Sequence, residues 1–221
     1  MRLFYIFIFC FAFTLACTHS AKADVYVWQD AQTGLVLSYP DTWSIVSNNS
    51  PDDILTIHAP SGRAHAMCRA RVRNDERFLI YPTRFSESVQ EVAYNTQFWD
   101  YYFREFTGPD FKLIKNGSGL GRAFAGYAIA EYTSAVPGPE MVRRGLAFAG
   151  NYNGQLFILE CSSHKDAFGE WKGPFLSIAD SVEMPKAYHE LMTGDYRNFL
   201  NENNVPLLRF KGTTSTQRKK Y

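Results

Sequence analysis

The stretch "GLVLSYPDTWSIV", residues 34–46, breaks an alternating apolar run with Pro40 and Asp41 and resumes it at Trp43. Because proline cannot donate a hydrogen bond to a sheet and aspartate favours turns, the break predicts a corner between two strands. Side chains alternate between the two faces of a strand, and this alternation places Trp43 on the inner face. We therefore expect a sheet-based fold in which Trp43 closes one end of a hydrophobic core.

Apolar and β-branched runs that predict strands recur along most of the chain. They cover residues 25–29, 35–39, 43–47, 54–60, 63–73, 111–116, 122–134, 141–152 and 155–162. Two connections, Ser61-Gly62 and Asn153-Gly154, carry tight-turn signals, so the strands that flank them are expected to form hairpins. Hairpin connections make a sheet largely antiparallel.

Helix signals interrupt these strands. Ser88 and Glu91 fit a capping box that opens a helix to about Phe106. A second helix is expected to begin at Ser163 and to restart at Pro174. Several strands are apolar on both faces, so helices are expected to cover both. The predicted fold class is α+β, with a largely antiparallel central sheet and helices on both faces, an α/β/α sandwich.

Two motifs within this order of elements point to a family. They are the "SYPDTW" corner, residues 38–43, and the closing apolar helix "FLSIADSV", residues 175–182, with a helix between strand groups and a glycine-turned hairpin in between. Over residues 24–185 the chain resembles the PsbP-like family, named for an extrinsic subunit of photosystem II and sharing its fold with a Ran-binding Mog protein. The resemblance implies an antiparallel sheet between helix layers and a non-catalytic binding or assembly role.

The first 23 residues have the features of a secretory signal peptide. Arg2 precedes an apolar run over residues 3–16, which is too short to span a bilayer comfortably, and Ala21-Lys22-Ala23 is a small-residue cleavage site. We expect cleavage before Asp24 and an exported protein in the periplasm or outside the cell. No second long apolar run follows, so no transmembrane segment is expected in the mature chain.

The four cysteines divide into two pairs. Cys10 and Cys17 lie in or next to the signal, and an alternative interpretation makes Cys17 the lipid anchor of a lipoprotein. Cys68 and Cys161 remain in the body of the chain, where an even pair in an exported protein favours a disulfide. The alternative is two buried thiols that pack as small hydrophobic side chains.

The sequence predicts one folded domain with a C-terminal extension. Residues 24–185 contain no linker-like stretch and are expected to form a single α+β sandwich domain. Residues 186–210 are expected to form a helix and an extension, and residues 211–221 a disordered basic tail. The helix is indicated by apolar spacing at Tyr188, Leu191, Met192, Phe199 and Leu200.

The distribution of charge bears on the class of partner. The chain has 23 Lys and Arg residues against 22 Asp and Glu, but several basic residues gather near the C-terminus, at Arg209, Lys211, Arg218, Lys219 and Lys220. The body is therefore mildly acidic, whereas nucleic-acid binding needs a basic face. We expect a protein partner, no nucleic acid and no cofactor.

His58 and His65 are candidate metal ligands. They lie symmetrically about Ser61-Gly62, so a two-residue turn would place both imidazoles on one face of a hairpin. Zinc takes three or four protein ligands, and the next residues on that face are Met67 and Arg69. The alternative is a pair of exposed or packed histidines.

Two further patterns favour structure over chemistry. Cys161 and His164 resemble a thiol with its base, but Cys161 shares its strand face with apolar residues, whereas a catalytic thiol needs an electropositive, exposed setting. The run "NGSGLGR", residues 116–122, is followed by a predicted strand and so lacks the helix N-terminus of a phosphate loop. It is expected to form a glycine-rich turn or bulge.

The aromatic run "QFWDYYFREF", residues 97–106, is the candidate partner-binding segment. Trp99, Phe103 and Phe106 can share one helical face, which leaves three aromatic side chains on other sides, Phe98, Tyr101 and Tyr102. They form either an exposed recognition patch or a surface that a second layer covers. Arg143 and Arg144 on a later hairpin are candidate anion contacts, or simply solvated side chains.

These patterns favour an exported non-catalytic protein that binds a partner or supports an assembly of the cell envelope. The alternative is an exported enzyme, a hydrolase, whose site forms only in the fold. A histidine within hydrogen-bond reach of a serine, cysteine or carboxylate in a cleft would favour the enzyme.

Overall fold

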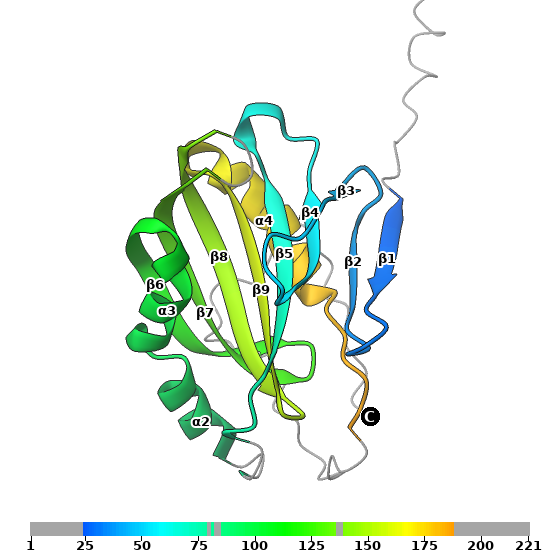
Figure 1. Ribbon diagram of the computed structural model, residues 1–221, viewed down its shortest axis with the longest axis vertical. Coiled ribbons are helices and arrows are strands. Elements are labelled where there is room, and N and C mark those ends of the chain that lie inside the picture. The colour runs from blue at the N-terminus through cyan, green and yellow to red at the C-terminus, as the bar shows by residue number, and fades with distance from the viewer. Residues whose placement is uncertain (1–23, 79–80, 82–84, 136–138, 188–221) are drawn as a thin grey trace, which may run out of the picture.

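The computed structural model describes residues 24–187 except 79–80, 82–84 and 136–138 (Figure 1). The strands are β1 (Val25–Gln29), β2 (Val36–Pro40), β3 (Ser44–Ile45), β4 (Asp53–His58), β5 (Met67–Asn74), β6 (Thr107–Leu120), β7 (Ala123–Ser134), β8 (Met141–Tyr152) and β9 (Gln155–His164). The helices are α2 (Ser86–Ala93), α3 (Thr96–Tyr102) and α4 (Phe168–Asp180), with 3-10 turns η1 (Gly62–Ala64), η3 (Phe103–Glu105) and η4 (Lys165–Ala167).

The main sheet has seven strands in the order β3-β4-β5-β9-β8-β7-β6. Every neighbouring pair is antiparallel, and β1 and β2 form a separate antiparallel hairpin. One hydrophobic cluster includes residues of α4 and β2, and a second on the opposite face includes residues of α2 and α3. Helices therefore cover both faces of an antiparallel sheet, and the predicted α+β class is confirmed.

The corner after β2 is formed as the sequence indicates. The Trp43 N–H donates to the Pro40 carbonyl, and the Trp43 side chain is buried against α4. Its ring lies 5.9 Å from that of Trp171 and 6.4 Å from that of Phe175, both edge-on. Aromatic pairs in this geometry add to the stabilisation that burial provides. The prediction that Trp43 is structural is confirmed.

Two glycine-containing connections also match their sequence signals. Asn153 and Gly154 join β8 to β9 with φ of 50° and 73°, the left-handed conformations that a type I′ hairpin turn requires. Residues 116–122 lie at the end of β6 and its turn into β7, where the register shifts between Lys115 and Ser118. The prediction of a turn or bulge at this segment is confirmed.

The prediction of one continuous helix over residues 88–106 is wrong. The segment is divided into α2, α3 and η3, with the break at Tyr94 and Asn95. The cause is local, because the Asn95 side chain accepts a hydrogen bond from the Phe98 N–H at 3.0 Å and so caps a new helix. By contrast, α4 runs through Pro174 without the expected restart.

The β4–β5 connection also differs from its prediction. Ser61 and Gly62 do not form a two-residue turn, because η1 occupies residues 62–64 and His65 ends it with φ of 45°. The residue opposite His58 is therefore Met67. The face-to-face histidine pair expected from the sequence is not formed.

The predictions for the two ends of the chain lie outside the described residues. These are the signal at residues 1–23, the anchor at Cys17, the helix and extension after Ala187 and the basic tail at 211–221. Within the described part of the chain, no helix combines the length and the apolar character needed to cross a membrane.

Candidate functional site

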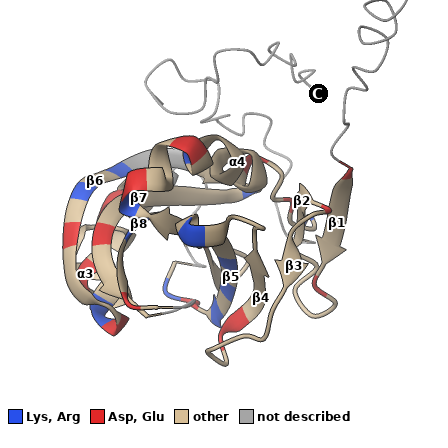
Figure 2. Cartoon of the chain, turned by 90° about the horizontal axis from the view of Figure 1, so that it is seen from above, with Lys and Arg blue, Asp and Glu red and all other residues tan. Residues whose placement is uncertain are grey.

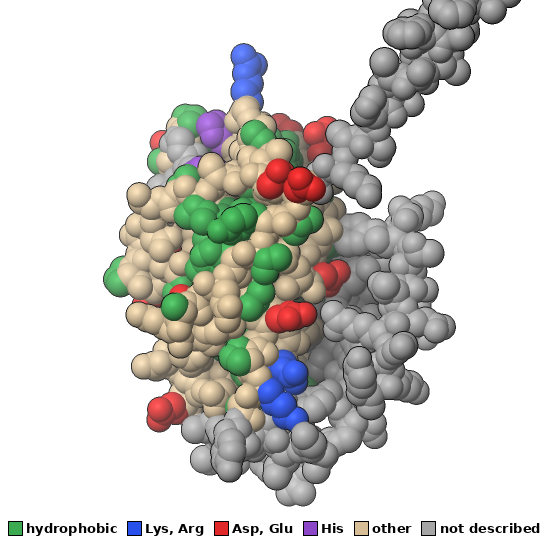
Figure 3. Space-filling view, turned by 90° about the vertical axis from the view of Figure 1, so that its right-hand side faces the viewer, with side chains coloured by type: hydrophobic (Ala, Val, Ile, Leu, Met, Phe, Trp, Pro, Cys, Tyr) green, Lys and Arg blue, Asp and Glu red, His purple; other side chains and the backbone are tan. Residues whose placement is uncertain are grey.

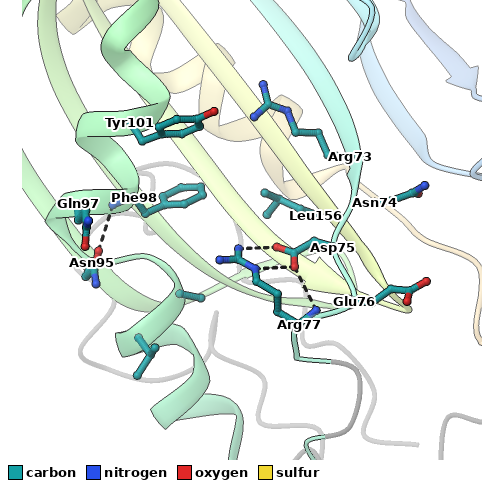
Figure 4. A pocket seen from close by; sticks show the side chains of 12 residues that line it. Arg73, Asn74, Asp75, Glu76, Arg77, Asn95, Gln97, Phe98, Tyr101 and Leu156 are labelled. Atoms are coloured by element: carbon teal, nitrogen blue, oxygen red, sulfur yellow. Dashed lines mark hydrogen bonds and ion pairs between the residues drawn. The ribbon is translucent and has the colours of Figure 1, made fainter.

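A groove lies between the end of β5 and the two helices α2 and α3 (Figure 4). Its volume is about 680 Å³. Three segments that are distant in sequence line it, with Arg73, Asn74, Asp75, Glu76 and Arg77 on one side, Val92, Ala93, Asn95, Gln97, Phe98 and Tyr101 on the other, and Leu156 on β9 between them. Two of the predicted partner-binding residues, Phe98 and Tyr101, are therefore part of this groove.

The break between α2 and α3 shapes the helical side of the groove. Since Asn95 starts a new helix here, Phe98 turns toward Leu156 and Tyr101 toward Arg73 (Figure 4). The Phe98 ring packs edge-on against Tyr94, with 5.3 Å between ring centroids. Tyr101 is 60% exposed. The groove thus has an apolar floor and an aromatic side chain at its mouth.

The opposite side of the groove carries balanced charges. The Arg73 Nε donates to Asp52 at 2.7 Å, and Arg77 makes two bonds to the Asp75 carboxylate, from Nε at 2.8 Å and from Nη2 at 2.6 Å. These bonds from Arg77 lower the pKa of the Asp75 carboxyl. Each arginine already has a carboxylate partner, so this rim offers hydrogen bonds without a large net charge.

Below α3, a buried network of charged groups and tyrosines joins the helix to the sheet. Arg69 on β5 lies opposite Glu160 on β9 and donates to it from Nε at 3.0 Å and Nη2 at 2.7 Å. The hydroxyls of Tyr102 and Tyr132 donate to the same carboxylate at 2.6 Å and 2.5 Å. Glu160 thus accepts hydrogen bonds from three side chains on three different elements.

A second carboxylate extends this network from η3. Glu105 accepts hydrogen bonds from both Arg69 and Arg71, the latter at 3.1 Å from Nη2. Arg71 also donates to Asp53 on β4 at 2.5 Å. Figure 2 shows the basic positions of β5 beside an acidic position of β4. Charge-assisted bonds of this kind fix geometry. They hold α3 and η3, and with them one side of the groove, in a defined position.

The ionisation of this network follows from its surroundings. Burial by itself raises the pKa of Glu160, but the Arg69 charge and the bonds from Tyr102 and Tyr132 outweigh it and lower that pKa overall. Burial, followed by the Glu160 charge, raises the pKa of both tyrosines. Glu160 is therefore a carboxylate near neutral pH, and both tyrosines keep their protons.

The remaining partner-binding candidates are placed differently from Phe98 and Tyr101. Tyr102 and Arg143 are buried. Tyr102 therefore follows the alternative of a covered side chain, whereas Arg143 is neither an exposed anion contact nor a solvated side chain. The Arg143 guanidinium donates to the Ser162 hydroxyl and to the His65 carbonyl, the latter at 2.7 Å. Arg144 is partly exposed and pairs with Glu131 across β7 and β8. The structure therefore does not bring the two arginines to the groove.

His58 and His65 lie at the other end of the β4–β5 hairpin from the groove. Burial, followed by the charges of Arg143 and His65, lowers the pKa of His58. No cluster of three or more His, Cys, Asp or Glu side chains suited to a metal ion occurs among the described residues. The metal site at this pair stays a prediction.

Cys68 and Cys161 form a disulfide that joins β5 to β9. Both residues are buried in the cluster beneath α4. The two cysteines are separated by 93 positions in the sequence, so the bond links the first half of the domain to the second. The interpretation as a disulfide is confirmed, and the alternative of two free thiols is wrong.

Sequence reasoning did not find the network around Glu160. A signal was present, because Glu160 interrupts the apolar strand segment of residues 156–161 and a charge in such a strand needs a partner. The alternation of Arg69, Arg71 and Arg73 on β5 was the complementary signal, since period two places them on one face. Neither pattern shows that Arg69 and Glu160, 91 positions apart in the sequence, are neighbours.

Comparison with known proteins gives similarity of fold. No family model matches the chain, and no curated protein does. Among solved structures, cyanobacterial PsbP (CyanoP) from Synechocystis sp. PCC 6803 is 16% identical, with a TM-score of 0.48 over 76% of this chain and 97% of that one. The chain resembles PsbP in fold.

A second similar structure is LpqN of Mycobacterium tuberculosis, which is described as involved in cell envelope biogenesis. It is 13% identical, with a TM-score of 0.46 over 73% of this chain and 91% of that one. At such identities the similarity concerns the fold and does not extend to ligands or partners. The PsbP-like resemblance expected from the sequence matches the first of these similar structures.

Proposed function

We propose that the protein is an exported, non-catalytic accessory protein that binds a polypeptide segment of a partner in the groove between β5 and α2–α3. The observation that carries the proposal is the placement of Phe98 and Tyr101 opposite Arg73 across one groove. Tyrosine, phenylalanine and arginine are enriched where proteins recognise each other, and most of the binding energy comes from a few such residues.

The apolar floor of the groove accounts for affinity. Phe98, Leu156 and Ala93 lie beneath the opening, and Val92 and Tyr101 extend the apolar surface at its edge. A leucine-sized or aromatic side chain that fills this floor gains about 1.5–3 kcal/mol from burial. A volume of about 680 Å³ accommodates such an anchor together with its neighbouring residues.

The polar rim of the groove favours a polypeptide as the ligand. Three side-chain amides, those of Asn74, Asn95 and Gln97, line the groove, and each amide can both donate and accept hydrogen bonds. Peptide groups need the same combination of donors and acceptors. Since Arg73 and Arg77 are already paired with carboxylates, the groove does not require a strongly acidic ligand.

The compartment is supported by the disulfide. Cys68–Cys161 joins two central strands, and such bonds form and persist in oxidising compartments. This is compatible with the signal peptide expected at residues 1–23. An exported domain that presents a fixed aromatic groove fits an accessory role in an envelope assembly.

A photo-crosslinking experiment tests this proposal. Tyr101 is replaced by a benzoylphenylalanine residue, the protein is irradiated in its native envelope, and the crosslinked peptide is identified. A synthetic peptide of that segment is then titrated against the purified protein. We expect binding that weakens about tenfold, equal to about 1.4 kcal/mol, in Phe98→Ala and in Tyr101→Ala.

Tyr26 supplies the matched control, because it is another exposed tyrosine and lies outside the groove. Tyr26→Ala should leave the affinity for the peptide unchanged. Equal affinity of the parent protein, Tyr101→Ala and Phe98→Ala for the peptide would reject the groove as the binding site. Turnover of the crosslinked segment by the purified protein would favour the hydrolase alternative instead.

A further inference from the structure

Strand β1 exposes apolar side chains on both of its faces. Val25, Tyr26 and Val27 are 62%, 52% and 61% exposed. The space-filling view of this side of the molecule shows hydrophobic side chains gathered on it, with acidic side chains around them (Figure 3). In the described part of the chain, β2 is the sole hydrogen-bonded neighbour of β1.

The outer edge of β1 also carries backbone groups available for pairing. The Asp30 N–H donates to Leu35 and the Asp24 carbonyl accepts from Asp41, so even-numbered residues of β1 point their backbone groups toward β2. In an antiparallel pair these groups alternate in direction. The N–H and C=O groups of Val25, Val27 and Gln29 therefore point away from β2.

This edge lacks the features that usually prevent strand addition. Natural edge strands are protected by lysine, proline, bulges or inward charges. The sequence of β1, VYVWQ, contains no charged residue and no proline, and its pairing with β2 has no register shift. Acidic residues flank it instead, with Asp24 and Asp41 at one end and Asp30 at the other.

We propose that residues 205–211 of this same chain, VPLLRFK, add to β1 as a further antiparallel or parallel strand. These residues lie outside the described part of the chain, which ends at Ala187. Their sequence has the composition of an apolar strand with two basic residues, Arg209 and Lys211, at one end, where they complement the acidic residues at one end of β1. This pairing is independent of the groove.

The path of the chain brings the C-terminal segment to the edge of β2 that faces away from β1. Glu183 pairs with Val36 of β2 through two backbone hydrogen bonds of 2.8 Å and 2.9 Å. Pro185 lies against Gly34, where an added Cβ would approach the proline ring within 2.9 Å. From Ala187, the residues before Val205 can span about 60 Å when extended, far more than the length of β1.

The proline of the segment fixes which residues can pair. Pro206 has no N–H, so it fits an edge strand only where its nitrogen faces away from the neighbour. The backbone groups then point toward β1 at Leu207, Arg209 and Lys211. They point away from β1 at Leu208 and Phe210. Because side chains two positions apart share a strand face, the apolar side chains of Leu208 and Phe210 lie on one face of the added strand.

Hydrogen exchange measured residue by residue tests this pairing. The chain as isolated is compared with the same chain ended after Asn204. We expect the amides of Val25, Val27 and Gln29 to exchange at least about tenfold faster in the shortened chain, because their hydrogen bonds are lost. The amides of Tyr26 and Trp28 pair with β2 and should exchange equally in both.

Two substitutions provide the matched comparison in the full-length chain. Leu208→Asp should abolish the protection of Val25 and Val27, whereas Ser215→Asp, which places the same charge beyond the segment, should leave it intact. Equal exchange in the isolated and the shortened chain would overturn the proposal. Protection that increases with protein concentration would also overturn it, since it would show pairing between two copies.

Discussion

The two faces of the β5–β9 strand pair are held together by different kinds of contact. Cys68 and Cys161 lie opposite each other and form a disulfide inside an apolar cluster beneath α4. At the adjacent pair of positions, Arg69 and Glu160 lie opposite each other on the other face and form an ion pair beneath α3. A shift of one residue along the same two strands thus changes the contact from covalent and apolar to ionic.

The difference shows which side of the sheet depends on the ionisation of its side chains. Apolar burial on the α4 side needs no particular state of ionisation. On the α3 side, buried charges repay their desolvation only when each has its partners in good geometry. The groove is attached to this conditional side through Tyr102 and Glu105. Its shape should therefore respond to changes that leave the α4 side intact.

The largest expected effect comes from removal of the carboxylate at the centre of the network. Glu160→Ala leaves the buried Arg69 guanidinium without this partner and removes the acceptor of two tyrosine hydroxyls. Breaking a buried ion pair in this way costs about 3–5 kcal/mol. Urea unfolding at neutral pH measures the change in the free energy of unfolding.

Glu131→Ala is the control for this prediction. Glu131 pairs with Arg144 directly across β7 and β8, so it is also an acidic residue in a cross-strand pair with arginine, but at a more exposed position. Its removal should cost less than about 1 kcal/mol. Similar losses in the two variants would show that burial of the Glu160 network has little energetic weight.

The disulfide is expected to have the next largest effect. Joint replacement Cys68→Ala and Cys161→Ala opens a loop of 93 positions, and loss of a disulfide of this kind costs about 2–4 kcal/mol. The comparison of the two faces also predicts where the loss is felt. Peptide affinity at the groove, measured below the unfolding transition, should remain, because Arg69 and Glu160 still pair. A folded double variant with no affinity would contradict the separation of the faces.

The pH dependence of stability separates the faces further. The pKa of Glu160 in the folded protein lies below the ordinary carboxyl value of 4.5, since the Arg69 charge and two tyrosine hydrogen bonds outweigh the opposing effect of burial. A lowered pKa means that the stabilisation is complete above about pH 4.5 and is lost as the pH falls through the folded-state value.

We therefore expect the free energy of unfolding to fall on acidification below this pH. In Glu160→Gln the decrease should be shallower, because residue 160 no longer titrates. Urea unfolding between pH 7 and pH 3 provides the comparison. Identical slopes in the parent protein and Glu160→Gln would assign the acid sensitivity to other carboxylates.

Much of the fold could be predicted because its signals are local. The Pro40-Asp41 corner, the Asn153-Gly154 turn and the alternation in β8 depend on residues close together in sequence. The break at Asn95 was missed although an asparagine is a common helix N-cap, because the aromatic spacing on either side of it continues a single helical pattern.

The candidate site was less accessible to sequence reasoning. Phe98 and Tyr101 were identified from an excess of aromatic area, but nothing local indicates that Leu156 and Arg73 lie beside them. Tyr102 could not be separated from Tyr101, because the partner of its hydroxyl, Glu160, is 58 positions away in the sequence. Long-range pairing of strands, rather than helix or strand propensity, decides the difference.

The two adjacent tyrosines give the smallest and most specific test of the comparison. Tyr102→Phe removes a hydrogen bond to a buried carboxylate and should cost about 1.5 kcal/mol of unfolding free energy. Tyr101→Phe removes an exposed hydroxyl and should change it by less than about 0.5 kcal/mol. The same atom is deleted from consecutive residues, so any difference in unfolding free energy reports their placement. Equal costs would mean that the Glu160 network does not hold α3, and the groove would lose the support that this network is proposed to give it.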